Sequence, residues 1–289
     1  MNGDGKISES GLFFLAIIMT YGGFCTDKSY LFFGRMTLVL TVLSGIFELI
    51  LLLAVIKLPC IGSGLLPIIA VPFCAFSLFS LSVKLSSDVF SYLPLAVIFA
   101  VCAALCAAIA IKGIDTCAGL ATVLSVVCAP GLLILGMLYL RVADVGIFVR
   151  NVTGFADFGT DGGVLGQAIP LSCVFNAFSL YCIKGTFAPI KTGRFAKLPE
   201  KKSANTDKLF AKALLSGFFV AFFVRLAVTV FLMFLAPCEV YRASGEVCAY
   251  CARLILGVNT AYVSYAACFF AAVIRISAPL CAIVLSKKE

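Results

Sequence analysis

Two charged residues stand inside apolar stretches that are long enough to cross a membrane. Glu48 lies in the middle of the run 38–56, and Arg225 lies in the middle of the run 214–235. A charged side chain at mid-bilayer costs roughly 2.5–3.5 kcal/mol on insertion scales, so such residues usually face a protein interior and find a partner there. The two positions therefore predict the polar centre of a helix bundle.

The composition requires elements that hold this centre inside a membrane. The chain is 62% hydrophobic and 12% charged, with a mean hydropathy of +1.13, whereas soluble domains are about 45–50% apolar and about 25% charged. Backbone groups must satisfy one another within lipid, and the alternating segments of a β-barrel are absent. The sequence predicts an all-α, polytopic helical membrane protein, with residues 1–289 forming a single integral membrane domain.

The apolar runs predict about eight transmembrane helices, since ~20 apolar residues cross the hydrocarbon core. The segment 142–166 is expected to be a turn-rich loop. Three charged residues interrupt the segment 240–257, which is expected to be a short interfacial or re-entrant segment. The predicted helices are 8–25, 36–57, 64–83, 90–111, 117–141, 167–184, 209–236 and 258–284.

The basic residues predict the orientation of the chain. Cytoplasmic loops carry an excess of Lys and Arg, so the loop 185–208 is expected to be cytoplasmic, and both termini with it. The net charge of +8 then reflects how the chain is oriented in the membrane, and no nucleic-acid partner is expected. Arg275, in the inner half of the last helix, is expected to snorkel to the cytoplasmic surface. The basic residues of the connection are Lys184, Lys191, Arg194, Lys197, Lys201, Lys202, Lys208 and Lys212.

Two of the predicted helices look interrupted. Gly22 and Gly23 are adjacent glycines, which are natural break points in a helix, and Asn176 is a polar residue within the sixth helix. Broken helices at matching positions of two halves indicate a binding site at the membrane midplane. Alternatively, the glycine pair simply ends the first helix, and Asn176 bonds to a neighbouring helix.

Enzymatic and metal chemistry find no support in the sequence. The chain has no histidine, and no two carboxylates lie together in a predicted helix, so an enzyme is not expected. The cysteines are scattered, and the one CxxC motif, Cys248–Cys251, lacks the second pair or histidines of a zinc site. Packing as small apolar residues is the main expectation, with a disulfide as the alternative. No cofactor or metal is expected.

The order of parts resembles the B subunit of spore germinant receptors. This is the GerAB family of endospore germination permeases, within the amino acid–polyamine–organocation (APC) transporter superfamily. The large basic connection after the sixth helix also fits this layout. The matching residues are Lys6-Ile7-Ser8, Leu12-Phe13-Phe14, Tyr21-Gly22-Gly23, Lys57-Leu58-Pro59, Arg253 through Gly257, and Ile274-Arg275-Ile276-Ser277.

The resemblance implies a LeuT-like fold of two inverted five-helix repeats, with the first and sixth helices unwound around the ligand. The second repeat is truncated here, because the layout lacks the family's last two helices. In this fold the second and seventh helices are symmetry mates within a four-helix core. The resemblance therefore implies that Glu48 and Arg225 form a buried ion pair, directly or through one side chain.

The resemblance also implies a function. The chain would bind a small nutrient, expected to be an amino acid, and signal spore germination to other germinant-receptor subunits in the bacterial cytoplasmic membrane, which is the inner membrane of the spore. The ligand's carboxylate would lie against free amides at a half-helix end. The expected ligand-binding residues are Thr20, Tyr21, Gly22, Gly23, Asn176 and Ser179.

Two alternatives belong to other classes. The first is an APC-type amino acid permease that transports an amino acid or a cation as a secondary transporter. The second is a structural membrane subunit that binds no ligand, which a packed and dry core around Asn176 would favour.

Overall fold

The structure is built almost entirely from helices. The computed structural model describes residues 7–26, 36–59, 65–88, 90, 92–153, 171–187, 202–235 and 258–286. Within these ranges there is no strand, and the one β feature is an isolated bridge between Ile7 and Phe187. The predicted all-α class is therefore confirmed for the part of the chain that is described.

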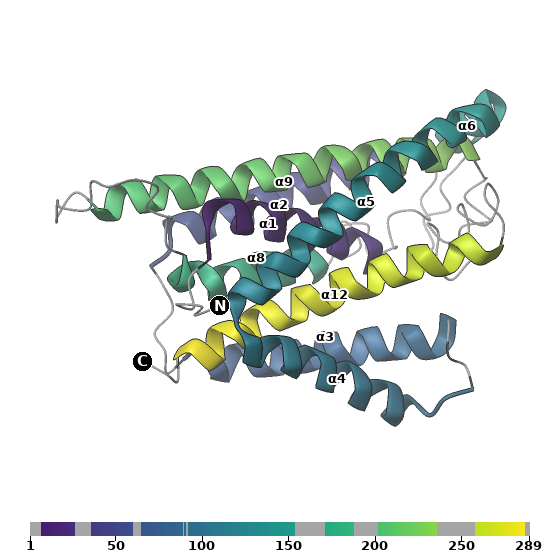
Figure 1. Cartoon of the computed structure of the whole chain (residues 1–289). Helices are drawn as coiled ribbons and strands as arrows, with labels where there is room; N and C mark the ends of the chain where they lie inside the picture. The colour runs from purple at the N-terminus through teal and green to yellow at the C-terminus, as the bar shows by residue number, and fades with distance from the viewer. Residues whose placement is uncertain are drawn as a thin grey trace, which may run out of the picture.

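The helices lie close to their predicted positions (Figure 1). Each of the eight predicted helices has a counterpart whose ends differ by a few residues. The segment 240–257 lies outside the described residues. The elements are α1 (Glu9–Thr26), α2 (Met36–Lys57), α3 (Leu66–Asp88), α4 (Leu95–Lys112), α5 (Ile114–Val142), α6 (Val145–Thr153), α8 (Leu171–Ile183), the 3-10 helix η2 (Lys184–Thr186), α9 (Lys202–Leu235) and α12 (Val258–Ser286).

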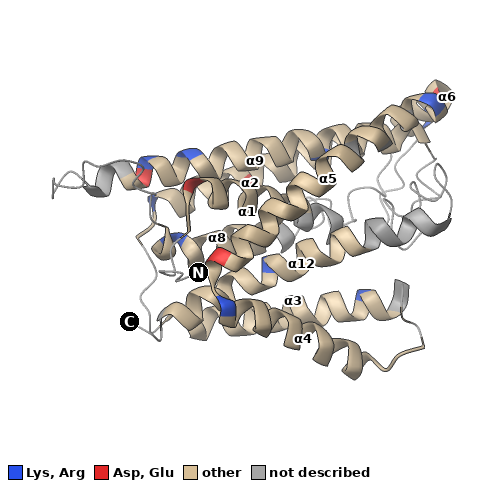
Figure 2. Cartoon of the chain, viewed as in Figure 1, with Lys and Arg blue, Asp and Glu red and all other residues tan. Residues whose placement is uncertain are grey.

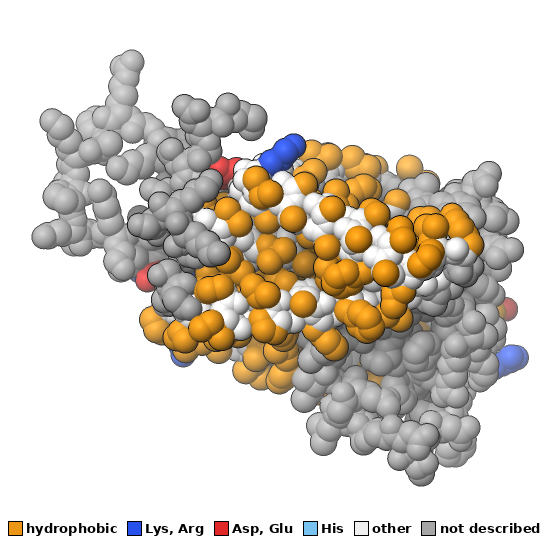
Figure 3. All heavy atoms as spheres, turned by 90° about the horizontal axis from the view of Figure 1, so that it is seen from below, with side chains coloured by type: hydrophobic (Ala, Val, Ile, Leu, Met, Phe, Trp, Pro, Cys, Tyr) orange, Lys and Arg blue, Asp and Glu red, His pale blue; other side chains and the backbone are white. Residues whose placement is uncertain are grey.

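Six described helices are long and apolar enough to cross a membrane, namely α2, α3, α4, α5, α9 and α12. Charged residues colour mainly the ends of the helices, and the long middle parts carry few of them (Figure 2). On the face seen from below, the described side chains are largely hydrophobic (Figure 3). These features indicate a polytopic membrane protein whose outer surface is suited to lipid.

Two predicted loops are partly helical. Within 142–166, residues 145–153 form α6, because the Asp144 carboxylate accepts a hydrogen bond from the Gly146 amide (2.7 Å) and caps the helix. Asn151 then donates to the Met233 carbonyl (2.7 Å), which anchors α6 on the end of α9. Within the basic loop 185–208, residues 202–208 already belong to α9.

The first helix is continuous, so the predicted break at Gly22 and Gly23 is wrong. Ser8 caps the helix, since its hydroxyl accepts a hydrogen bond from the Gly11 amide (3.0 Å). The helical backbone then runs through both glycines to Thr26. Glycine lowers helix stability, but inside lipid an interrupted helix would leave backbone groups without partners at a larger cost.

Glycines allow close approach between helices of the core. An added Cβ at Gly217 of α9 would lie 2.5 Å from the Phe13 carbonyl oxygen and 2.9 Å from the Ala16 side chain, both in α1. A Cβ at Gly45 of α2 would lie 2.2 Å from the Phe222 ring of α9. Both positions therefore act as small-residue contacts of the kind that bring membrane helices together.

Both chain ends lie at the same end of the bundle, which we call the termini end (Figure 1). The Ile7 amide donates to the Thr186 carbonyl (2.9 Å), so α1 begins where α8 stops. The Lys184 ammonium donates to the Val55, Ile56 and Leu58 carbonyls (3.2, 2.7 and 2.7 Å). This lysine caps the last turn of α2, whose carbonyls lack helical partners. We call the opposite end, where α2 begins and α9 ends, the far end.

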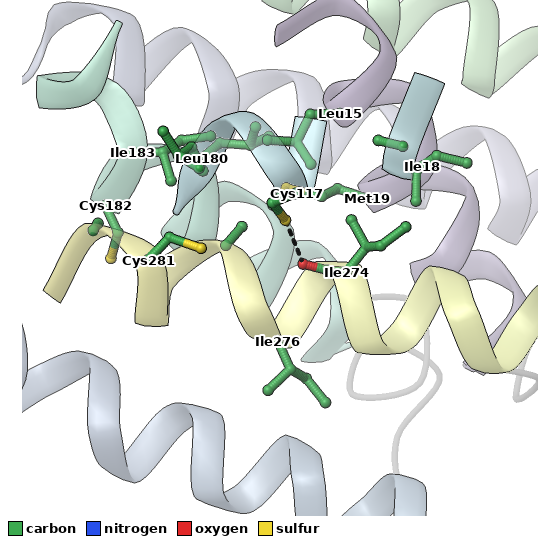
Figure 4. Packing of buried hydrophobic residues seen from close by; sticks show 14 of the residues in the cluster. Leu15, Ile18, Met19, Cys117, Leu180, Cys182, Ile183, Ile274, Ile276 and Cys281 are labelled. Carbon is green, nitrogen blue, oxygen red and sulfur yellow. Dashed lines mark hydrogen bonds between the residues drawn. The ribbon is translucent and has the colours of Figure 1, made fainter. Parts of the chain in front are cut away.

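The helices form two interleaved groups. Helices α1, α2, α8 and α9 contact one another in a four-helix core, and α12 packs between α1, α3, α4, α5 and α8. Buried thiols help to seat α12: Cys117 donates to the Ile274 carbonyl (3.5 Å; Figure 4), and Cys74 donates to the Ile276 carbonyl (3.7 Å). These cysteines are free thiols that pack as small apolar residues. Cys248 and Cys251 lie outside the described residues.

The α1–α9 contact predicts the effect of a single methyl group. Gly217→Ala should destabilise the protein by about 1–3 kcal/mol, because the added Cβ meets the α1 backbone, which cannot move aside easily. Gly119→Ala in α5 is the matched control, since its Cβ would meet nothing within 4 Å; it should be neutral or stabilise by up to about 1 kcal/mol. Thermal unfolding in detergent would measure both, and equal effects would contradict the α1–α9 contact.

The Lys184 cap predicts a second difference in stability. Lys184→Met should destabilise the protein by about 1.5–3 kcal/mol, the size of a lost charged hydrogen bond, because three carbonyls lose their donor. Lys212→Met removes an exposed lysine of α9 nearby and should change the unfolding free energy by less than about 0.5 kcal/mol. If both variants unfolded at the same temperature, Lys184 would not cap α2.

Candidate functional site

The centre of the four-helix core is a buried carboxylate. Glu48 is 1% exposed, and at ~1.5 Å per residue it lies roughly 14 Å from the carboxyl end of α2 and roughly 18 Å from its start. Its Oε1 accepts a hydrogen bond from the Asn176 amide of α8 (2.9 Å). Its Oε2 accepts one from the Cys173 thiol (3.8 Å). The acid is therefore held between α2 and α8.

Arg225 of α9 completes an ion pair with this carboxylate. Its Nη1 lies 3.9 Å from Glu48 Oε2, and the guanidinium is almost fully buried. Its Nη2 donates to the Ser44 hydroxyl, one turn before Glu48 in α2. Ser44 in turn donates to the Thr41 carbonyl (2.9 Å). The two charges thus interact over a long direct contact, and Ser44 holds the guanidinium in place beside it.

Buried polar atoms without partners surround the pair. The Thr20 hydroxyl of α1 is close enough to act on the Glu48 carboxyl group, but its oxygen completes no hydrogen bond of normal geometry. Among the described residues, Asn176 Oδ1 and the Ser179 hydroxyl also lack hydrogen-bond partners. A buried polar atom without a partner costs about 1–3 kcal/mol. Such atoms indicate a place for water or for a polar ligand.

The structure brings some predicted site residues together and separates others. Thr20, Asn176, Glu48 and Arg225 lie in one cluster, and Ser179 follows Asn176 by one helical turn, fully buried. Tyr21 is half-buried beside Thr20.

Gly22 and Gly23 do not offer the free amides that were expected. Their amides belong to the last turns of an unbroken helix, and the carboxyl end of a helix repels a carboxylate. The predicted interruption at Asn176 is also absent, since α8 is continuous from Leu171 to Ile183.

Two residues of the cluster were not predicted, Ser44 and Cys173. Ser44 stands four residues before Glu48, so the helical period places both on one face; this spacing could have identified it. Cys173 stands three residues before Asn176, so the same period places these two on one face, but nothing in the sequence distinguished it from the thirteen other cysteines.

Arg275 does not reach the cytoplasmic surface, so the expected snorkelling is wrong. The residue is 7% exposed, and its guanidinium lies 4.7 Å from the centre of the Phe175 ring in α8. Phe175 also stacks on Phe73 (4.7 Å). A cation over an aromatic face is stabilised electrostatically even away from water, so α12 can keep this charge inside the bundle.

Comparison with known proteins does not assign the chain to a family. No known protein-family model matches the chain, and no curated protein matches it.

The ion pair predicts a non-additive mutant cycle. Glu48→Gln alone should destabilise the protein by about 3–5 kcal/mol, because it leaves the Arg225 charge buried without its counter-ion. The double change Glu48→Gln with Arg225→Gln should cost less than the sum of the two single changes. Chemical unfolding in detergent would measure the cycle.

Glu9→Gln is the control, because it removes a carboxylate from the half-buried first turn of α1 and should cost no more than about 1 kcal/mol. Strictly additive losses at positions 48 and 225 would show that the two charges do not interact.

Proposed function

We propose that this chain is the membrane subunit of a nutrient receptor, similar to the B subunit of spore germinant receptors. It binds a small amino acid between α1, α2, α8 and α9. The protein senses the nutrient and breaks no bond. Its partners are other receptor subunits, and its place is the bacterial cytoplasmic membrane, with both termini on the cytoplasmic side.

The observation that carries this proposal is the set of unpartnered polar atoms, from Thr20, Asn176 and Ser179, beside a buried ion pair. An amino acid carries one positive and one negative group a few ångströms apart. Its ammonium suits the Glu48 carboxylate and Asn176 Oδ1, which accept hydrogen bonds, and its carboxylate suits Arg225, which donates in pairs. The ligand would then satisfy groups that are costly to bury without partners.

The buried charges favour a ligand with a carboxylate. Arg225 and Arg275 place two guanidinium groups in the interior of the described part, against the one carboxylate of Glu48. A carboxylate-bearing nutrient can contact such a guanidinium, whereas a simple cation would be repelled by it, so the carboxylate is the better fit.

The helix directions also support the resemblance. Helices α1 and α8 run in opposite directions, and so do α2 and α9 (Figure 1), as two inverted repeats require. The four helices of the expected core contact one another.

The ligand is recognised by side chains here, because α1 and α8 are unbroken. Its binding would replace the Glu48–Arg225 contact and shift α2 against α9, which is the movement that partner subunits would detect.

One observation favours a second candidate, a structural subunit without a ligand. Glu48, Asn176, Ser179 and Arg225 are each at most 2% exposed, so the cluster is closed. In this case the polar groups would only fix how the four helices pack.

A binding experiment separates these candidates. The twenty amino acids would each be added to the purified full chain in lipid nanodiscs, and thermal unfolding would be followed. A ligand that binds only the folded state stabilises it by RT ln(1 + L/Kd), where L is the free ligand concentration, and so raises the unfolding temperature. If the chain is a receptor, at least one amino acid should raise this temperature. Asn176→Ala should weaken this effect by about tenfold or more, the size expected for one charged hydrogen bond.

Asn151→Ala is the matched control, since Asn151 is also a buried asparagine but bonds to the Met233 carbonyl near the far end. It should lower stability and leave the affinity unchanged. A wild-type protein that responds to none of the twenty would favour the structural subunit. Uptake of the bound amino acid into sealed vesicles would favour the secondary transporter.

A further inference from the structure

Ser179 of α8 lies one turn past Asn176 toward the termini end, but most other buried hydroxyls of the four-helix core lie on the opposite side of Glu48. On α2 they are Thr37, Thr41 and Ser44, all buried and all between Glu48 and the start of the helix. Their spacing of three and four residues places them on one face with Glu48. Thr41 donates to the Thr37 carbonyl (2.8 Å), and Ser44 donates to the Thr41 carbonyl (2.9 Å). The hydroxyls therefore do not tie α2 to another helix.

Helix α9, which is antiparallel to α2, also carries buried polar residues one helical turn apart. Arg225 bonds to Ser44, and Thr229 follows Arg225 by one turn, fully buried and bonded to the Arg225 carbonyl (2.9 Å). Because α2 and α9 are antiparallel, Thr229 lies on the same side of the ion pair as Thr41. The polar faces of both helices thus extend from the pair toward the far end. We call this the polar half of the core.

Apart from Ser179, the fully buried side chains of the same four helices between Glu48 and the termini end are apolar. The residues there have their side chains fully or almost fully buried and belong to one hydrophobic cluster, part of which Figure 4 shows. They are Leu52 and Val55 of α2, Leu180 and Ile183 of α8, Leu12 and Leu15 of α1, and Phe210, Leu214 and Phe218 of α9.

Among the described residues of the four core helices, this cluster reaches the polar half only at Phe175 of α8. Leu40, Leu232 and Met233 are buried there, but they do not belong to the cluster. At the termini end, by contrast, polar contacts close the apolar half: Lys184 caps α2, and the Tyr181 hydroxyl donates to the Pro59 carbonyl (2.6 Å). One end of the core is sealed, and the other end is lined by hydroxyl groups.

This asymmetry determines where water is stable. A buried water molecule needs about two to four polar partners, and a hydroxyl that donates to its own helix still has acceptor capacity. The polar half supplies such groups at Thr41, Ser44 and Thr229, and Thr37 adds a hydroxyl that has no hydrogen-bond partner among the described residues. The apolar half supplies one fully buried hydroxyl, that of Ser179, and none at the cluster positions named above. Among the described residues, the polar groups that could hold water beside the ion pair therefore lie mainly on its far-end side.

We infer that the Glu48–Arg225 site is reached from the far end, through the hydroxyl-lined faces of α2 and α9, and is closed toward the termini end. The inference relies on the proposed function only for the identity of the solute, a small zwitterion. With the termini end in the cytoplasm, an orientation that is also taken from the proposed function, the site receives its ligand from outside the membrane. A sensor needs access from this one side only, whereas a transporter also needs a second state that opens to the other side.

Two native thiols of α8 allow a direct test. Cys173 lies in the polar half and contacts Glu48, while Cys182 lies in the apolar half. The test adds a membrane-impermeant trimethylammonium methanethiosulfonate to sealed right-side-out and inside-out vesicles, and peptide mass spectrometry follows each cysteine. Val152→Cys marks the exposed far end, and Lys212→Cys marks the exposed termini end. Cys173 should react in the vesicles in which the far-end marker reacts, about tenfold faster than Cys182, because a polar lining lowers the free energy of local opening.

Equal rates for the two thiols, no reaction of Cys173 from either side, or reaction only alongside the termini-end marker would each overturn the inference. Thr41→Val should slow the reaction of Cys173 several-fold. Ser82→Ala is its control, because Ser82 is a buried hydroxyl of α3 that also bonds within its own helix (2.8 Å); it should change nothing. An unchanged rate in Thr41→Val would contradict the role of the lining.

The outcome is separable from that of the proposed function, since the reaction needs no nutrient. If sided reactivity is found but no amino acid protects Cys173, the access route stands and the proposed ligand fails. If an amino acid binds but reactivity is not sided, the access route alone fails.

Discussion

The contact between Glu48 and Arg225 constrains the rest of this structure. Neither charge is stable in lipid by itself, so α2 and α9 must face each other at the depth of the pair. Asn176 and Cys173 then fix α8 against the carboxylate, and Gly217 brings α1 close to α9. The four-helix core is therefore arranged around a polar centre, and the apolar contacts fill the space between its helices.

The pair also divides this core into unlike halves. Toward the termini end the helices are joined by a continuous hydrophobic cluster and by the Lys184 cap, which together form a rigid base. Toward the far end the same helices present hydroxyl groups that bond to their own carbonyls. The proposed movement of α2 against α9 depends on this difference between a closely packed half and a hydroxyl-lined half.

Much of the fold could be predicted from the sequence, because lipid leaves the backbone few choices. Apolar runs give the eight predicted helices with ends that differ by up to seven residues, and the isolated charges single out Glu48 and Arg225, whose pairing the resemblance implied. The errors arise where local propensity competes with the membrane or with tertiary contacts. Gly22 and Gly23 do not break α1, since lipid penalises unpaired amides. Helix α6 was not predicted, because its stability depends on Asn151 bonding to α9. Arg275 is retained inside by Phe175, which lies a hundred residues away. Local sequence cannot show such partners.

The account depends on the claim that the centre of the core holds a polar guest, either water or a nutrient, beside the ion pair. An experimental density map of the protein in a lipid nanodisc, at a resolution that shows ordered water, tests this most directly. The account predicts ordered density within hydrogen-bonding distance of Asn176 Oδ1 and the Thr20 hydroxyl. A map in which α1, α2, α8 and α9 pack against one another with no such density around a closed ion pair would contradict it.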